Sequence, residues 1–300
     1  MRFPSTRSLQ ALRHAAAGIL GLAVLSLSSP QAAAQQLDLE HCICFGDSLT
    51  NNDFLGLVYG NPQSLYDKDP FEAMFAKSAP GGATLNSFAL AGATSRDLAG
   101  QINTYEALEF LFLAPTATLF QIEIGGNDFL DNVQLLGSAA PGQNATADAV
   151  VNRVLGRLES ALKRLRPRQG VEMVLWTIPD ITITPEWLGR LNATQIANIR
   201  AHTKRANDRI RMFRGRPRVA VLDFEKLQVA VVNNPPVIQG NPLIPPPSFG
   251  DYDDLHADGV HPTAVANALI ANAMIDLLNG KFGTSFPFYS AQELADLARF

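Results

Sequence analysis

The chain has 300 residues, of which 47% are hydrophobic and 17% are charged, with a formal net charge of −4. This composition is typical of a globular protein with a large buried core, and it excludes a disordered or fibrous chain. The mild excess of acidic residues argues against a nucleic-acid-binding protein, which carries a basic face. The densest basic run, 163–168, is interpreted as the solvated end of a helix. No stretch of about 18 apolar residues occurs, so no membrane-spanning helix is predicted.

Residues 1–34 have the pattern of an export signal. Arginines but no acidic residues precede a continuous apolar run at 15–27, and Ala32–Ala34 supply the small residues that a signal peptidase requires. We therefore expect cleavage before Gln35, a secreted or periplasmic protein, and a single domain over 35–300. An organelle presequence is the alternative for the first 34 residues, because this stretch is also rich in Arg and Ser.

Cys42 and Cys44 are the two cysteines of the chain, and both fall in a short strand-like run. Neighbours on the same face of a strand lie about 6.5 Å apart. The usual Cβ separation across a disulfide is only about 4 Å. We therefore predict two buried free thiols.

Apolar strand-like runs alternate with helical patterns along the mature chain. Such alternation predicts an α/β fold with a parallel sheet covered on both faces. The predicted strands are 42–45, 84–90, 117–124, 171–178 and 219–224.

The helical patterns lie between and after these runs, and they follow apolar spacing, proline at a first turn, or a capping box. The predicted helices are 148–166, one starting at Thr184-Pro185-Glu186, 194–213, 263–278 and a short one after Ser290. The proline-rich stretch 233–254 is predicted to be a long loop, either a lid or wall over the functional site or an irregular surface loop.

Ligands of open α/β sheets bind beyond the carboxyl ends of the strands, so the residues that follow each strand are the candidates for chemistry. Ser48 follows the first strand beside a glycine and at a helix start, where a nucleophile would be exposed and developing negative charge favoured. Gly92 follows the second strand and lets its N–H approach a substrate closely. Asn127 follows a double glycine after the third, where its side-chain amide could contact an oxyanion.

The pattern Asp258-Gly259-Val260-His261-Pro262 brings a carboxylate and an imidazole together within one turn. Asp258 can then fix the tautomer of His261, which leaves the other ring nitrogen to accept the proton of a serine. His256 is a rival base in the same segment, although it could instead line the pocket.

These motifs, in this order, resemble the GDSL family of esterases and lipases, also called SGNH hydrolases. The resemblance spans roughly residues 42–280. Its four blocks are Phe45-Gly46-Asp47-Ser48-Leu49-Thr50, Ala91-Gly92-Ala93-Thr94, Gly125-Gly126-Asn127-Asp128-Phe129 and Asp258-Gly259-Val260-His261-Pro262-Thr263.

The resemblance implies a three-layer αβα sandwich with a five-stranded parallel sheet. It also implies that Ser48 is the nucleophile, that His261 is the general base and acid, and that Asp258 orients this histidine. The oxyanion hole would comprise the N–H groups of Ser48 and Gly92 and the side-chain amide of Asn127. Asp47 and Asp128 are interpreted as turn-forming residues, and the reaction needs no metal or organic cofactor.

These residues predict hydrolysis of a small-molecule, lipid or sugar ester through an acyl-serine. An acyltransferase or a carbohydrate O-acetyl esterase would use the same site, and a binding protein that has lost activity is a further alternative. The apolar residues after two of the motifs are candidates for an acyl pocket or for the core. They are Phe54, Leu55, Leu57, Phe129 and Leu130.

Overall fold

The computed structural model describes residues 37–51, 68–166, 168 and 170–300, all of which belong to the compact unit Gln35–Phe300. The predicted export signal lies outside the described residues. Within the described part of the chain, no helix has the length and apolarity needed to cross a membrane.

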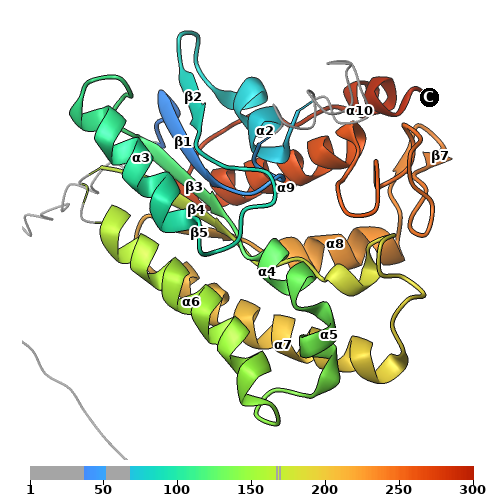
Figure 1. Ribbon diagram of the computed structural model, residues 1–300. Helices are drawn as coiled ribbons and strands as arrows, with labels where there is room; N and C mark the ends of the chain where they lie inside the picture. Colours follow the sequence, from blue (N-terminus) through green and yellow to red (C-terminus); the bar gives the residue numbers. More distant parts are fainter. Residues whose placement is uncertain (1–36, 52–67, 167, 169) are drawn as a thin grey trace, which may run out of the picture. The chain divides into compact units, whose positions relative to one another are not determined.

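The centre of the fold is a five-stranded parallel sheet, as predicted (Figure 1). Its strands are short, and all except the partly exposed edge strand β2 are largely buried on both faces, as parallel strands covered by helices must be. They are β1 (His41–Gly46), β2 (Thr84–Ser87), β3 (Leu119–Glu123), β4 (Glu172–Trp176) and β5 (Val219–Leu222), in the spatial order β2-β1-β3-β4-β5. The second predicted strand was too long by three residues, although the N–H groups of Phe88 and Leu90 still donate to carbonyls of β1.

Helices cover both faces of the sheet and complete the predicted three layers (Figure 1). On one face, α3 (Leu98–Phe110), α6 (Ala145–Leu165) and α7 (Ala193–Arg211) pack over Ile43 and Phe45 of β1. On the other face, α2 (Pro70–Ser78) and α9 (Ala264–Phe282) pack over Cys42 and Cys44. Alternate residues of one strand therefore serve two separate cores. Both thiols are buried and unbridged, as predicted, and burial raises the pKa of each.

Side-chain caps set the beginnings of several helices. The side chains of Asn144 and Thr263 accept hydrogen bonds from the first turns of α6 and α9. The capping box predicted at Ser290 and Glu293 is confirmed and begins α10 (Ala291–Ala298). The predicted end of α9 was wrong by four residues, because the helix continues to Phe282 and ends at Gly283, which has a φ of 69°.

Two predictions for the loops need correction. No helix begins at Thr184-Pro185-Glu186, because a 3-10 turn, Ile181–Ile183, and further turns lead to α7, and the N–H of Glu186 donates to the carbonyl of Gly259. The stretch 233–254 is also not wholly irregular, since β6 (Val237–Ile238) and β7 (Asn241–Pro242) pair antiparallel within it. The remaining short elements are α4 (Gly126–Asp131), α5 (Val133–Ser138), the 3-10 helix Met212–Gly215 and α8 (Phe224–Asn233).

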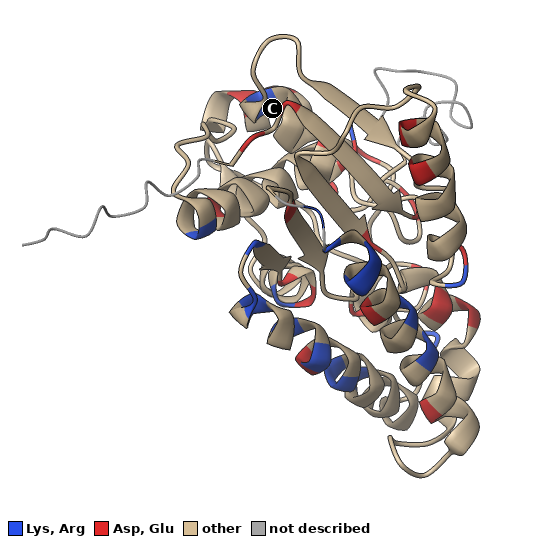
Figure 2. Cartoon of the chain, turned by 90° about the vertical axis from the view of Figure 1, so that its left-hand side faces the viewer, with Lys and Arg blue, Asp and Glu red and all other residues tan. Residues whose placement is uncertain are grey.

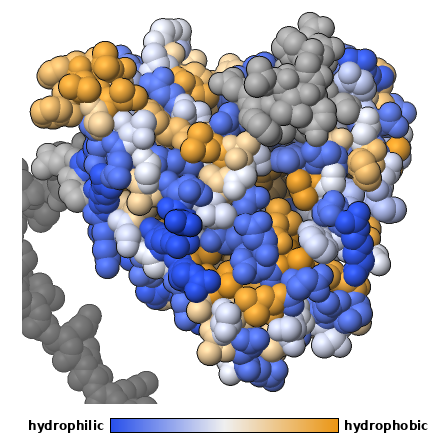
Figure 3. Space-filling model, viewed as in Figure 1, coloured by the Kyte–Doolittle hydropathy of each residue, from blue (hydrophilic) through white to orange (hydrophobic). Residues whose placement is uncertain are grey.

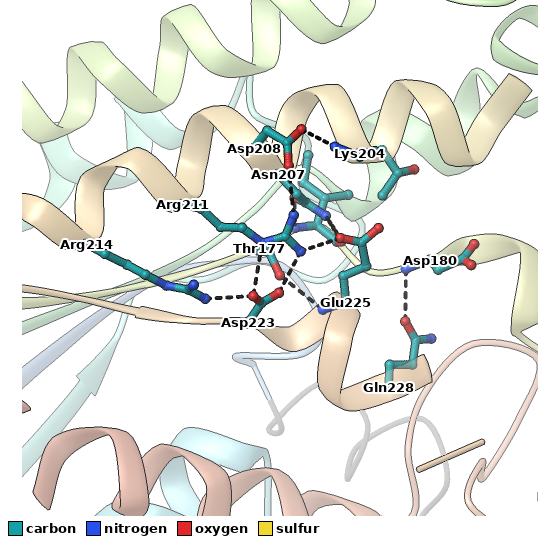
Figure 4. A network of polar contacts seen from close by, with 12 residues as sticks. Thr177, Asp180, Lys204, Asn207, Asp208, Arg211, Arg214, Asp223, Glu225 and Gln228 are labelled. Carbon is teal, nitrogen blue, oxygen red and sulfur yellow. Dashed lines mark hydrogen bonds and ion pairs between the residues drawn. The ribbon is translucent and has the colours of Figure 1, made fainter. Parts of the chain in front are cut away.

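A polar network fixes the start of α8 (Figure 4). Arg211 of α7 donates two hydrogen bonds to Asp223, at 2.7 and 3.0 Å, and one to Glu225 at 2.6 Å. The N–H of Asp180 donates to Gln228 at 2.9 Å, which ties the loop after β4 to the same helix. This network matters for function because α8 supplies one wall of the cavity described below.

The surface carries two distinct features. Over the face seen in Figure 2, basic and acidic residues are interspersed rather than gathered by sign. Ion pairs such as Arg205 with Asp148 and Arg209 with Glu159 link α6 to α7. Apolar side chains gather instead at the end of α3, in the upper left of Figure 3, where 110–113 are exposed.

Candidate active site

The candidate site lies at the carboxyl edge of the sheet, where β1 and β3 are neighbours. After β1 the chain adds β2 on one side, then returns to add β3 on the other, so the two connections diverge at this point. Such a switch point leaves a crevice in which ligands of α/β proteins bind. Ser48 follows β1, and Asn127 follows β3.

Ser48, His261 and Asp258 form a continuous hydrogen-bonded chain. The Nε2 atom of His261 lies 2.7 Å from Oγ of Ser48, and its Nδ1 atom lies 2.8 Å from Oδ2 of Asp258. The other carboxylate oxygen, Oδ1, accepts hydrogen bonds from the N–H groups of Val260 and His261, both at 2.8 Å. The predicted spacing of three residues thus places the carboxylate and the imidazole in contact.

The carboxyl group of Asp258 is held ionised. Burial alone would raise its pKa, but the hydrogen bonds from His261 and the backbone outweigh burial and hold the pKa well below its usual range. A fixed anion beside Nδ1 keeps the proton on that nitrogen, so Nε2 is available as an acceptor for the hydroxyl of Ser48.

Asn127 and Gly92 line the same cavity as Ser48. Nδ2 of Asn127 donates to the carbonyl of Ala93 at 2.9 Å, which fixes the orientation of the amide. Gly92 has a φ of 76°, a left-handed conformation that favours glycine. Asp128 accepts hydrogen bonds from N–H and Oγ of Ser95, at 2.6 and 2.9 Å, and so joins α4 to the loop that carries Gly92.

Asp47 shapes the turn that presents Ser48. Its Oδ1 accepts a hydrogen bond from the N–H of Leu49 at 3.1 Å, and its carbonyl accepts one from the N–H of Thr50 at 3.1 Å. The interpretation of Asp47 and Asp128 as turn-forming residues therefore agrees with the contacts of both. Sequence reasoning missed the partner of Asp47, which is Glu123 at the end of β3. The available signal was an acidic residue at the end of an otherwise apolar buried strand.

A cavity of about 350 Å³ extends from Ser48 between α8 and α9. Ser48, His261, Asn127 and Gly92 all contribute to its lining. Further along, its walls are mostly apolar and include Leu227, Val231, Val232, Ala266, Leu269 and Ile270. None of the described residues from 233 to 254 lines this cavity, so the predicted proline-rich lid is not part of its wall.

The predicted acyl-pocket residues divide into three groups. Leu130 lines the cavity, as expected of a pocket residue. Phe129 instead faces the core and is fully buried there, because it lies on the opposite side of the short helix α4. Phe54, Leu55 and Leu57 lie outside the described residues.

The other described histidines are poorer candidates for the base, because each has other contacts or is buried. His256 lines the cavity, but its ring is buried, and burial lowers its pKa to about 4, so it is neutral near pH 7. His41 contacts Thr84, and His202 contacts the carbonyl of Ala139. Of the candidate bases in the described chain, His261 is the one that contacts the serine. Among the described residues, no group of three or more His, Cys, Asp or Glu side chains could hold a metal ion.

Comparison with known families identifies the class of protein. The chain matches the family described as GDSL-like Lipase/Acylhydrolase over residues 43–274, which is most of its length. It therefore belongs to this family of ester hydrolases, and the resemblance predicted from its four sequence blocks is confirmed. No curated protein sequence matches the chain.

Solved structures share the fold at low sequence identity. The chain is similar to a lipase from a goat rumen metagenome, with a TM-score of 0.53 and 14% identity over 79% of this chain and 96% of that one. It is also similar to phospholipase A1 from Streptomyces albidoflavus, with a TM-score of 0.47 and 18% identity over 81% of this chain and 99% of that one. A third similar structure is a variant of an acetyl xylan esterase from Geobacillus stearothermophilus, with a TM-score of 0.47 and 15% identity over 84% of this chain and 100% of that one. At this identity, the first likeness supports the fold, and none of the three identifies the substrate.

Proposed function

We propose that this chain is an exported serine ester hydrolase in which Ser48 forms a covalent acyl intermediate. The observation that carries the proposal is the unbroken chain of hydrogen bonds from Ser48 through His261 to Asp258, at one end of an apolar cavity. Nucleophile, base and orienting carboxylate in contact are the arrangement that activates a serine hydroxyl.

In the first step, Oγ of Ser48 attacks the ester carbonyl carbon while Nε2 of His261 accepts the hydroxyl proton. The imidazolium that forms lies against the Asp258 carboxylate, which stabilises its charge. His261 then gives the proton to the departing alkoxide, and the alcohol leaves an acyl-serine. His261 then deprotonates a water molecule, which attacks the acyl group. The carboxylic acid is released and the free serine is regenerated.

The negative oxygen of each tetrahedral intermediate needs donors that are fixed in advance. The proposed donors are the N–H groups of Ser48 and Gly92 and the side-chain amide of Asn127. Support comes from their common position in the cavity lining and from the contact to Ala93 that orients the amide of Asn127. Donors held this way stabilise the transition state without reorganisation at the moment of reaction.

The cavity favours an ester with an apolar acyl chain over an acetylated sugar. Beyond Ser48 its walls are mostly Leu, Val and Ile side chains from α8 and α9, and the polar Gln228 among them already accepts a hydrogen bond from Asp180. Burial of each methylene in such an environment contributes about 0.8 kcal/mol. The hydroxyl groups of a sugar would find few hydrogen-bond partners along the same walls, and unpaired buried hydroxyls are costly.

The experiment is hydrolysis of p-nitrophenyl esters from acetate to palmitate, with Ser48→Ala as the inactive reference. We expect serine-dependent turnover with kcat/KM rising from acetate to longer chains. Val232→Trp, which narrows the cavity, should lower the ratio of palmitate to acetate turnover at least tenfold, while Val237→Trp, at the exposed position of β6, should not. Turnover confined to acetate, with no effect of Val232→Trp, would contradict an apolar acyl site. Product analysis with an added alcohol separates hydrolysis from acyl transfer.

Export is proposed from residues 1–34, whose arginine-rich start, apolar run and small residues have the pattern of a signal peptide. Expression of the full chain in a secreting host, followed by sequencing of the mature amino terminus, tests this. The expected first residue is Gln35. An intact Met1 terminus on protein retained in the cytoplasm would contradict export.

A further inference from the structure

Two carboxyl groups are buried together directly beneath the turn that carries Ser48. Asp47 is 3% exposed and Glu123 is 2% exposed. The register of the sheet pairs Gly46 of β1 with Glu123 of β3, so the residue after Gly46 meets the end of the neighbouring strand. The side chains of Asp47 and Glu123 are hydrogen-bonded to each other.

The surroundings supply donors but little positive charge. Thr50 donates its hydroxyl to Oε2 of Glu123 at 3.3 Å, and the N–H of Leu49 donates to Asp47. The titratable groups that face the pair are His261, from the loop before α9, and Asp128, from α4. In the described part of the chain, neither carboxyl group forms an ion pair with a lysine or arginine.

Two carboxylates in contact and out of water cannot both be ionised at moderate cost, so one of them retains a proton. Burial raises the pKa of both groups, and the charge of Asp47 and the hydrogen bond to Asp47 raise that of Glu123 further. Asp47 also accepts a hydrogen bond from the N–H of Leu49 and faces His261, and both favour its ionised form, so we assign the retained proton to Glu123.

We propose that Glu123 is a positioning residue that stays protonated and donates a hydrogen bond to Asp47, thereby fixing the Asp47–Thr50 turn and the direction of the Ser48 hydroxyl. The proposal rests on the proposed role of Ser48. Loss of the proton would leave two negative charges side by side, and repulsion would loosen the turn. The enzyme would then lose activity in alkaline solution for a reason separate from His261.

Glu123→Gln provides the first test, because its amide donates to Asp47 permanently while its oxygen still accepts from Thr50. In the wild type, we expect kcat/KM to fall about tenfold per pH unit once Glu123 ionises. Glu123→Gln should restore the activity lost in Glu123→Ala and should lack this alkaline fall. The matched control is Glu172→Gln, a buried glutamate at the opposite end of β4, which should keep the wild-type profile. Superimposable profiles for the wild type and Glu123→Gln would overturn the proposal.

A second readout does not depend on activity. A carboxyl group with a raised pKa in the folded state stabilises the fold fully below its unfolded value of about 4.3, and this stabilisation disappears as the pH rises through the folded value. The Tm of Glu123→Gln relative to the wild type should therefore increase steadily from pH 5 to pH 9. A difference in Tm that stays constant from pH 5 to pH 9 would overturn the proposal that Glu123 keeps a proton in the folded state. Absence of any ester hydrolysis by the wild type would refute the proposed function instead. The Tm series would still show whether Glu123 is protonated in the folded state.

A second, independent observation concerns the exposed residues Phe110–Leu113, here named the apolar tip. Phe110 is 80% exposed and Phe112 is 96% exposed, and Phe112 adopts a positive φ of 59° (Figure 3). Four large apolar side chains in a row, turned to solvent, are unusual in a soluble protein and indicate an interaction surface. The positive φ of a bulky residue adds backbone strain that a merely solvated loop would not need.

The basic run 163–168, at the end of α6, lies beside the last turns of α3, which lead into the apolar tip. Ion pairs of Arg164 with Glu106 and of Arg168 with Glu109 join the end of α6 to the end of α3. Lys163 and Arg166, in the same basic run, form no ion pair with any residue that the structure describes. Exposed apolar residues on the same end of the molecule as cations without an ion-pair partner are the combination that binds an anionic lipid surface.

We infer that the apolar tip inserts into anionic lipid surfaces. The tip precedes β3, at the amino edge of the sheet, so a molecule docked in this way keeps the Ser48 edge away from the lipid. Flotation with vesicles of phosphatidylglycerol and phosphatidylcholine tests this, with pure phosphatidylcholine as the neutral comparison. Wild-type protein should float with anionic vesicles, and salt should weaken its binding.

The double variant Phe110→Ser/Phe112→Ser should lower the bound fraction at least tenfold, and Lys163→Glu/Arg166→Glu should lower it on anionic vesicles. Phe249→Ser, at an exposed phenylalanine elsewhere, is the matched control and should bind as the wild type does. Circular dichroism verifies the fold of each variant. Absence of flotation would overturn the inference, as would wild-type dimers that Phe110→Ser/Phe112→Ser converts to monomers without any lipid binding.

Discussion

Oγ of Ser48 and Nε2 of His261 lie 2.7 Å apart although 213 positions separate them in the chain. The contact depends on two local structures: the turn after β1, which Asp47 shapes, and the turn before α9, in which Asp258 accepts three hydrogen bonds from Val260 and His261. The serine and the histidine proposed as its base are therefore held in contact before a substrate arrives.

Asp258→Asn should lower kcat by about four orders of magnitude. Oδ1 of Asp258 accepts two backbone N–H groups, so the amide oxygen of the variant would take that place. Its NH2 group would then face Nδ1 of His261, which would move the ring proton to Nε2 and remove the acceptor for Ser48. Steady-state kinetics on an ester that the wild type hydrolyses, with the exposed Asp251→Asn as control, measures the effect. A loss below tenfold would contradict the orienting role of Asp258.

Asn127→Ala should lower kcat about 10² to 10³-fold with a small change in KM. A donor that serves the oxyanion acts mainly in the transition state, and its loss costs about 3–4 kcal/mol. The comparison variant is Asn234→Ala, at an exposed position beyond α8. A rise in KM at constant kcat would show that Asn127 binds the ester in its ground state instead.

Gly46→Ala should destabilise the fold by about 3 kcal/mol or more. A Cβ atom at this position would lie 2.2 Å from the carbonyl oxygen of Glu123 and 2.8 Å from Oγ1 of Thr50. The first of these is backbone in the neighbouring strand, so it cannot move aside without disturbing the sheet. Urea unfolding tests this against Gly81→Ala, where no atom lies within 4 Å. Equal stability of the two variants would contradict the close approach of β1 and β3.

The buried His256 should make the fold sensitive to acid. Burial lowers its pKa to about 4, whereas the unfolded chain titrates near 6.5. The unfolded state thus binds more protons between these values, so stability is fully present above pH 6.5 and falls by about 3 kcal/mol towards pH 4. Between pH 7 and pH 4.5, the Tm of His256→Gln should fall less than that of the wild type. The Tm of the control His41→Gln should fall as much as that of the wild type. Identical acid sensitivity of His256→Gln and the wild type would exclude this contribution.

Sequence patterns predicted most of the fold because its physical signals are local. Five apolar runs, three of them ending at a glycine, gave the five strands, and the capping box at Ser290 gave the last helix. Thr184-Pro185-Glu186 misled because proline suits a first helical turn, yet a backbone contact to Gly259, distant in sequence, determines the conformation here. The end of α9 was misplaced because Asn279 does not end the helix but accepts a hydrogen bond from the N–H of Phe286.

The candidate site was predictable where neighbouring residues carry it, as in the contact between Asp258 and His261. The partner of Asp47 was not, because Glu123 reaches it through the register of two strands. The walls of the cavity were equally hidden, since Val232 and Leu269 meet only when α8 and α9 pack side by side. Such contacts between distant residues have no signature in a single sequence.

The most direct test of the central claim is to locate the adduct left by a p-nitrophenyl phosphonate, which reacts with activated serines as an ester does but is not released. Peptide mass mapping after this treatment should find one phosphonyl group on Ser48 in the wild type and none in Ser48→Ala. A modified residue other than Ser48, or ester hydrolysis that persists in Ser48→Ala, would contradict the assignment of Ser48 as the nucleophile.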